Sequence, residues 1–173
     1  NVIGGEINIS GAGNLFNDNG TMTVGATGLV HGFGFIGSNY NDRPVRFVGG
    51  KLSADVNGET LNHYYGYLAG DGAVLEAKNG GILALSAGQL TGEGAGFAVN
   101  STTGVVQASG EYISGLYAGS TGEGIRVTAN STLYDATVNG RMNITGGVLS
   151  GRGSANVIGG EINISGAGNL FND

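Results

Sequence analysis

Short runs of alternating apolar and polar residues, each opened by a glycine, recur along the chain. The third and fifth positions are apolar, as in GEINI from Gly5, GTMTV from Gly20, GILAL from Gly81 and GRMNI from Gly140. A period of two bounded by turn residues is typical of a short β-strand with one buried face. The predicted inward-facing residues are Ile7, Ile9, Met22, Val24, Leu52, Leu83, Leu85, Val106, Met142, Ile144 and Leu149.

The distances between these glycines predict how the strands are arranged. Most of them are close to multiples of seven to eight residues. Three strands with their turns would then form one coil of about 22 residues, and coils that stack about 4.8 Å apart bury a common core. The pattern predicts an all-β fold, a three-faced parallel β-helix or β-solenoid. We expect it to be right-handed, as crossovers between parallel strands usually are.

An exact repeat predicts the domain organisation. Residues 1–18 read NVIGGEINISGAGNLFND, and residues 156–173 repeat them letter for letter at an offset of 155. We interpret residues 1–155 as one β-solenoid unit of about seven coils, and residues 156–173 as the start of the next identical unit. The expected partners are therefore adjacent identical units in a tandem array.

Three stretches depart from the alternating pattern, at residues 31–44, 57–68 and 109–123. We expect longer turns or side loops there. Their tyrosines suit contact with a neighbouring fibre or with surface glycans. The alternative is that they cover the flank of the solenoid or stack in aromatic ladders. The predicted contact residues are Tyr64, Tyr65, Tyr67, Tyr112 and Tyr117.

Composition excludes several classes of protein. Glycine supplies 37 of 173 residues, with one proline and no cysteine, while 40% of residues are hydrophobic and 12% charged. Such a chain is neither disordered nor collagen-like, and its glycines disfavour helices. The net charge of −6 argues against nucleic-acid binding. Because no apolar run approaches the roughly 18 residues that cross a bilayer, we expect no membrane insertion in this segment.

Catalytic and metal-binding signals are weak. His31 and His63 lack metal-ligand spacing, and the carboxylates are dispersed. A glycan-cleaving β-helix would place carboxylates on neighbouring coils of one face, about 5–9.5 Å apart for a hydrolytic pair. Glu76 could point outward into such a row, but no partner one coil away is evident. We therefore expect no catalytic residue and no cofactor, and predict that the protein is not an enzyme.

One segment partly matches a calcium-binding repeat. The run SGAGNLFNDNG resembles the nonapeptide GGxGxDxUx, but Leu15 stands where the aspartate is required. Asn17, Asp18 and Asn19 instead favour a turn, because Asn and Asp side chains bond readily to nearby backbone. We expect no metal site.

The segments GGEINISGAG, NGTMTVGATG, AVLEAKNGGILALSAGQLTG and MNITGGVLSGRG carry a family resemblance. In texture they are similar to the repeat regions of giant bacterial surface proteins, namely autotransporter passengers and filamentous-haemagglutinin-like adhesins. The resemblance implies export to the cell surface, right-handed β-helical architecture and a role in adhesion or extracellular fibres. The expected function is a non-enzymatic, extracellular structural repeat that forms a stiff filament or adhesin shaft. The alternative is a glycan-active or glycan-binding β-helix of the polysaccharide lyase or tailspike kind.

Overall fold

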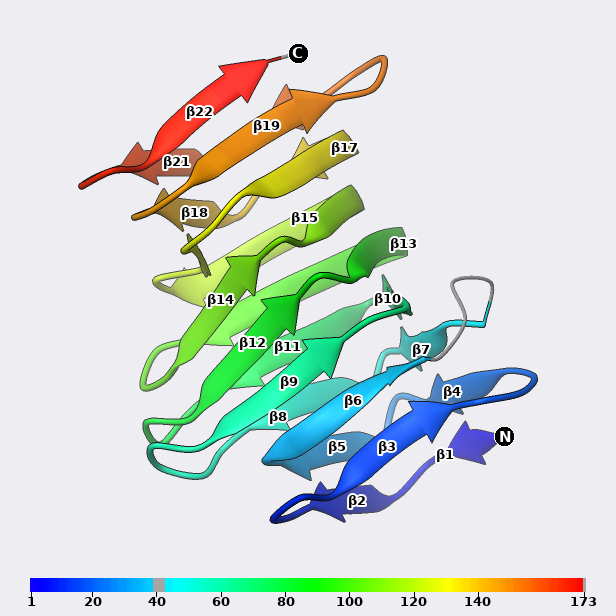
Figure 1. The fold of residues 1–173 in the computed structure, drawn as a ribbon. Helices are drawn as coiled ribbons and strands as arrows, with labels where there is room; N and C mark the ends of the chain where they lie inside the picture. The colour runs from blue at the N-terminus through cyan, green and yellow to red at the C-terminus, as the bar shows by residue number, and fades with distance from the viewer. Residues whose placement is uncertain (39–42, 173) are drawn as a thin grey trace.

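The strands stack into a right-handed column (Figure 1). The computed structural model describes residues 1–38 and 43–172, and within them it contains 22 strands and no helix. All strand pairings in these residues are parallel, as the sequence predicts. The column has three faces, which we number in the order in which the chain first meets them.

Each face is a ladder of parallel strands. Face 1 contains β1 (Val2–Ile3), β4 (Met22–Val24), β7 (Val45–Val48), β10 (Tyr67–Asp71), the first parts of β13 (Gln89–Ser101), β15 (Tyr112–Gly122) and β17 (Ser131–Val138), then β19 (Val148–Arg152) and β22 (Asn169–Asn172). Face 2 contains β2 (Glu6–Ile9), β5 (Leu29–Gly32), β8 (Lys51–Ala54), β11 (Ala73–Ala77), the second parts of β13, β15 and β17, and β20 (Val157–Ile158). Face 3 contains β3 (Asn14–Asn17), β6 (Gly34–Ser38), β9 (Thr60–Tyr64), β12 (Ile82–Ser86), β14 (Val105–Ser109), β16 (Ile125–Val127), β18 (Arg141–Ile144) and β21 (Glu161–Ile164). One strand of face 3 belongs to each turn, so its eight strands correspond to about eight turns.

The inward-facing residues predicted from the alternating pattern form the core. Nine of the eleven are buried, and Ile7 and Met22 are partly buried and pack against the others. Because each turn contributes apolar side chains from all three faces, neighbouring turns share one continuous core along the column.

The expectation of side loops at residues 31–44, 57–68 and 109–123 is wrong for the described residues. These stretches supply β6, β9 and β15, which are strands of the column, while residues 39–42 lie outside the described part. In residues 109–123 the alternation is interrupted, because the ladder between β15 and β17 shifts register between Ser114 and Gly115. Gly115 adopts φ +65°, and a Cβ there would lie 2.0 Å from the carbonyl oxygen of Gly92. This bend therefore requires glycine.

The length of a turn varies along the column. Residues that pair one turn apart are separated by 17 positions for Ile125 and Met142, and by 27 for Ile36 and His63. The regular coil of about 22 residues expected from the sequence is thus an average.

Candidate functional site

Exposed aromatic side chains gather at the corner between faces 3 and 1. The rings of Tyr64 and Tyr65 meet edge to face with their centroids 4.2 Å apart, and Phe35 lies 6.5 Å from Tyr64. Tyr65 occupies the turn after β9 with φ +61°, which directs this non-glycine residue away from the strand. All three side chains are exposed.

Tyr112, at the start of β15, lies between two grooves beside this corner. A groove of about 320 Å³ lies between Tyr65 and Tyr112, and its floor includes Gly88 and Gln89. A second groove of about 370 Å³ continues beyond Tyr112 and is lined by polar groups that include Asn130, Thr132, Ser150 and Arg152. We call Phe35, Tyr64, Tyr65 and Tyr112 the aromatic corner.

Two of the five predicted contact tyrosines lie elsewhere. Tyr67 is half-buried at the start of β10. Tyr117 is fully buried, and its prediction as a surface contact is wrong. Its ring stacks on Phe97 at a centroid distance of 5.1 Å, its hydroxyl donates to the Arg141 carbonyl oxygen at 3.0 Å, and burial raises its pKa to about 12. No sequence pattern placed it inside, because β15 bends at Gly115, between the buried Ile113 and Tyr117.

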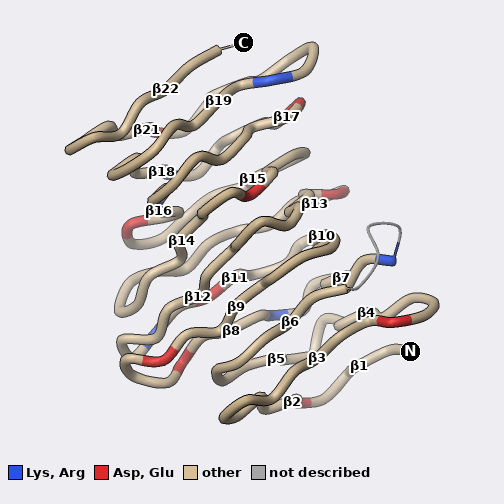
Figure 2. The backbone as a smooth tube through the Cα atoms, in the orientation of Figure 1, with Lys and Arg blue, Asp and Glu red and all other residues tan. Residues whose placement is uncertain are grey.

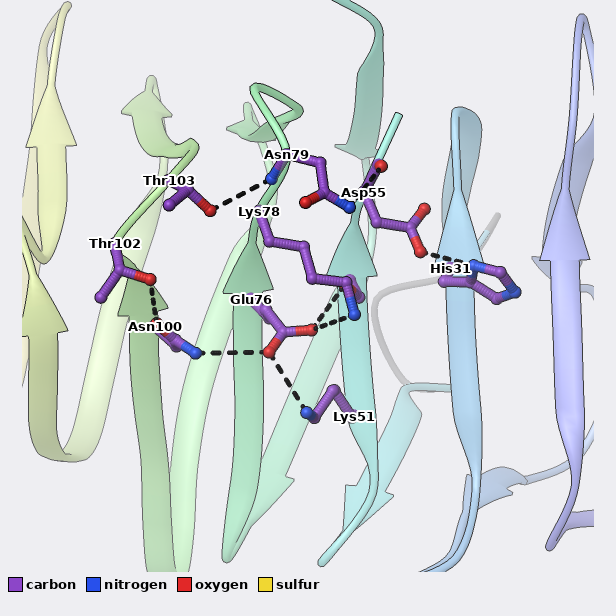
Figure 3. A network of polar contacts seen from close by, with 10 residues as sticks. His31, Lys51, Asp55, Glu76, Lys78, Asn79, Asn100, Thr102 and Thr103 are labelled. Atoms are coloured by element: carbon purple, nitrogen blue, oxygen red, sulfur yellow. Dashed lines mark hydrogen bonds and ion pairs between the residues drawn. The ribbon is translucent and has the colours of Figure 1, made fainter. Parts of the chain in front are cut away.

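Face 2 carries a polar network centred on Glu76 (Figure 3). The Glu76 carboxylate accepts hydrogen bonds from Ser53 Oγ at 2.8 Å and Lys51 Nζ at 3.2 Å on the preceding turn, and from Asn100 Nδ2 at 3.3 Å on the next turn. Lys78 Nζ lies 3.1 Å away. The sequence pattern does not predict these partners, because only stacking brings residues 23 to 25 positions apart into contact.

The network holds Glu76 in its charged form. Burial alone would raise the pKa of this carboxyl, which is only 5% exposed, but the hydrogen bond from Ser53 and the two lysines outweigh burial and lower it. The bonded carboxylate thus links three successive turns of face 2.

His31 lies on the same face between two carboxylates. Its Nδ1 is 2.8 Å from Asp55 on the next turn, and its Nε2 is 2.9 Å from Glu6 on the preceding turn. Burial would lower the pKa of His31, but the hydrogen bonds and charges of Asp55 and Glu6 raise it overall. A protonated His31 therefore offsets part of the negative charge of two acids that would otherwise face an uncharged ring.

The second histidine is enclosed in the column. His63 Nδ1 lies 3.3 Å from Glu111 Oε1, and both side chains are fully buried. Glu111 Oε2 accepts a hydrogen bond from the Gly88 backbone at 2.9 Å. This pair lies behind Gly88, where an added Cβ would come within 2.6 Å of the His63 ring.

Asp71 and Glu123 also have bonded partners. Asp71 accepts a hydrogen bond from the Ala95 backbone at 2.8 Å, and Glu123 pairs with Arg126 at 2.6 Å.

Asn17 ends β3, and its amide donates to the carbonyl oxygens of Gly20 and Arg43. Among residues 1–38 and 43–172, no group of three or more His, Asp or Glu is arranged to hold a metal ion.

The C-terminal end of the column exposes apolar side chains. Ile164 is 53% exposed, whereas its sequence counterpart Ile9 is 5% exposed under the next turn. Leu170 and Phe171 are also exposed, and with Leu133 and Ile158 they line a cavity of about 420 Å³. The same 18-residue sequence is thus covered by a following turn at the start of the column and left uncovered at the C-terminal end.

Charge is distributed along the column. Figure 2 shows acidic and basic residues scattered over several turns and loops, without a continuous basic stripe in the part drawn in colour. The described residues also include no helix that is long and apolar enough to cross a bilayer.

Comparison of the chain with protein-family models, with curated proteins and with solved structures finds no match.

Proposed function

We propose that this chain is a segment of a non-enzymatic structural rod that acts outside the cell as a filament or adhesin shaft. The observation that carries the proposal is the uncovered apolar end, built from the same 18 residues that lie beneath a further turn at the start of the chain. In the first copy these 18 residues are stacked beneath the turn that follows them. The second copy has the same sequence and is therefore suited to stack beneath the same turn of a further unit.

The column has the construction expected of a stiff rod. Its backbone hydrogen bonds join one turn to the next on all three faces, and its apolar core extends from Ile9 to Leu149. Bending would have to break contacts on one face and compress them on another, and dense packing resists both. Adding a unit therefore extends the rod without requiring a new core.

The test is a two-unit protein in which residues 1–155 precede the 173-residue chain. We expect small-angle scattering to show that the particle lengthens by about 35 Å while its cross-section stays the same, since turns stack about 4.8 Å apart. The 173-residue chain is the matched control. Two separately moving bodies, or one shorter and thicker particle, would contradict the rod.

The aromatic corner favours a second candidate function, which is glycan binding. Tyrosine rings stack on sugars, and the polar groups of the two grooves beside Tyr112 offer hydrogen bonds. We expect Tyr112→Ala to weaken binding to an immobilised polysaccharide at least tenfold. Tyr134→Ala is the matched control, because Tyr134 is 50% exposed but lines neither groove.

Two further measurements decide this second candidate. Equal binding by the two variants, or no binding of the unchanged protein to neutral and acidic polysaccharides, would exclude it. Release of new reducing ends that is lost in Glu76→Gln would instead favour a glycan-active enzyme over the rod.

A further inference from the structure

The two copies of the 18-residue segment lie on different faces of the column. Val2 and Ile3 pair on face 1 with Thr23 and Val24, whereas Val157 and Ile158 pair on face 2 with Thr137 and Val138. The other two strands of the segment move in the same way: β2 is on face 2 and β21 on face 3, while β3 is on face 3 and β22 on face 1. Each strand of the second copy has therefore advanced by one face.

The advance follows from the length of the unit. Going from residue 2 to residue 157, the chain completes seven turns and one additional face. The inward and outward sides are nevertheless preserved. Ile7 pairs with the core residue Val30, and its counterpart Ile162 pairs with the core residue Met142. The second copy is thus rotated around the column without turning its apolar side outward.

We infer that β20, β21 and β22 form the surface on which the rest of the next unit stacks. That unit's counterparts of β4, β5 and β6 pair with these three strands, as β4, β5 and β6 pair with β1, β2 and β3 in the first copy. Each unit is then rotated by one face around the column relative to the unit before it. The partner is a second copy of the unit, and the inference rests on the proposed rod. The expected pairs are already visible in the first copy, where Val24 covers Ile3, Val30 covers Ile7 and Ile36 covers Leu15. All three covering side chains are fully buried there.

Charges at this junction support the same register. In the first copy, Glu6 is bonded to His31 on the turn that follows it, at 2.9 Å. In the second copy, its counterpart Glu161 is bonded to Arg141 on the turn that precedes it, at 2.8 Å. A continuing column brings both contacts to one carboxylate, with Arg141 on one side and the next unit's counterpart of His31 on the other.

The rotation determines where surface features recur. Three units, each of seven turns and one face, complete 22 turns before the same residue returns to the same face. At about 4.8 Å per turn this distance is about 106 Å. Successive aromatic corners therefore point in three directions around the rod, so that lateral contacts are available on every side.

Disulfide cross-linking in the two-unit protein tests the junction, since the chain contains no cysteine. Val157→Cys is combined with Thr137→Cys, because Thr137 is the residue of the preceding unit that pairs with Val157 on face 2. The matched control is Val2→Cys with Thr23→Cys, a pair already adjacent on neighbouring strands. We expect both pairs to oxidise to the same extent, because outward-facing neighbours on paired strands lie within disulfide range.

A second measurement uses Ile9 and Ile164, which occupy identical sequences. In the 173-residue chain Ile164 is half exposed, so Ile164→Ala should reduce the folding equilibrium constant much less than Ile9→Ala. In the two-unit protein a further turn covers Ile164. The effect of Ile164→Ala should then grow about tenfold or more and approach that of Ile9→Ala.

The outcomes separate the junction from the rod. An extended rod in which the control pair oxidises, the junction pair stays reduced and Ile164→Ala keeps its small effect would overturn the one-face rotation and leave the rod intact. Two independently moving units would overturn both. Cross-linking at the junction together with the larger effect of Ile164→Ala supports the rotation.

Discussion

Gly140 and Tyr117 offer a direct test of how tightly the column is packed. A Cβ built on Gly140 would lie 2.2 Å from Cζ of the Tyr117 ring, far inside van der Waals contact. The ring has little room to retreat, because it stacks on Phe97 and its hydroxyl is bonded to the Arg141 carbonyl oxygen. Gly140 does not have a positive φ, so its backbone tolerates alanine and the cost of substitution comes from the clash.

We expect Gly140→Ala to destabilise the column by about 2–4 kcal/mol. Overpacking a well-filled core costs about 1–3 kcal/mol, and displacing the ring also breaks a hydrogen bond worth about 1 kcal/mol. In a Tyr117→Ala background the space is open, so Gly140→Ala should cost almost nothing. The double-mutant cycle should therefore give a coupling energy of about 2–4 kcal/mol.

The measurement is urea unfolding followed by far-ultraviolet circular dichroism. Gly119→Ala is the matched control, because Gly119 has neither a positive φ nor any atom within 4 Å of an added Cβ. It should leave stability unchanged or increase it by up to about 1 kcal/mol. If Gly140→Ala costs the same with and without the Tyr117 ring, or no more than Gly119→Ala, the packing argument fails.

Three further predictions concern pH, each measured as the stability of a variant relative to the unchanged protein across a titration. The pKa of Tyr117 is about 12 in the folded protein, against an ordinary value of 10. Its protonated form therefore stabilises the fold below pH 10, and about 2–3 kcal/mol of stability is lost as the pH rises from 10 to 12. Tyr117→Phe should remove this loss, and an unchanged alkaline profile of the variant would contradict the prediction. The pKa of His31 is raised, so its contribution to stability is complete below pH 6.5 and disappears as the pH rises through the pKa of the folded protein. The stability of His31→Gln should not change over this pH range for this reason, and a variant that still loses stability there would disprove the assignment. The pKa of Glu76 is lowered, so its contribution to stability is complete above pH 4.5 and is lost as the pH falls through the pKa of the folded protein. Glu76→Gln should therefore lose less stability in acid. A loss of stability as steep as in the unchanged protein would rule this out.

Local alternation was sufficient to predict the fold class and much of the core. Leu83 and Leu85 lie two positions apart within a glycine-bounded run, and both are fully buried in the structure. A strand directs alternate side chains to opposite sides, so inward and outward positions can be assigned within a few residues. The exact repeat at residues 156–173 likewise predicts stacked units without reference to coordinates, and that organisation stays a prediction.

Contacts between turns needed the tertiary structure, because they join residues about 20 positions apart. The partners of Glu76 and the surroundings of His31 depend on register, and turns that vary from 17 to 27 residues prevent register from being counted along the chain. The burial of Tyr117 depends on its position on a bent strand that crosses from one face to the next.

The one-face advance of the second copy has the same origin. The sequence shows that the segment returns after 155 residues, but only the summed lengths of individual turns and bends decide which face it returns to. Side-chain alternation is a local property of the backbone. The face on which a strand lies depends instead on the lengths of all the turns that precede it.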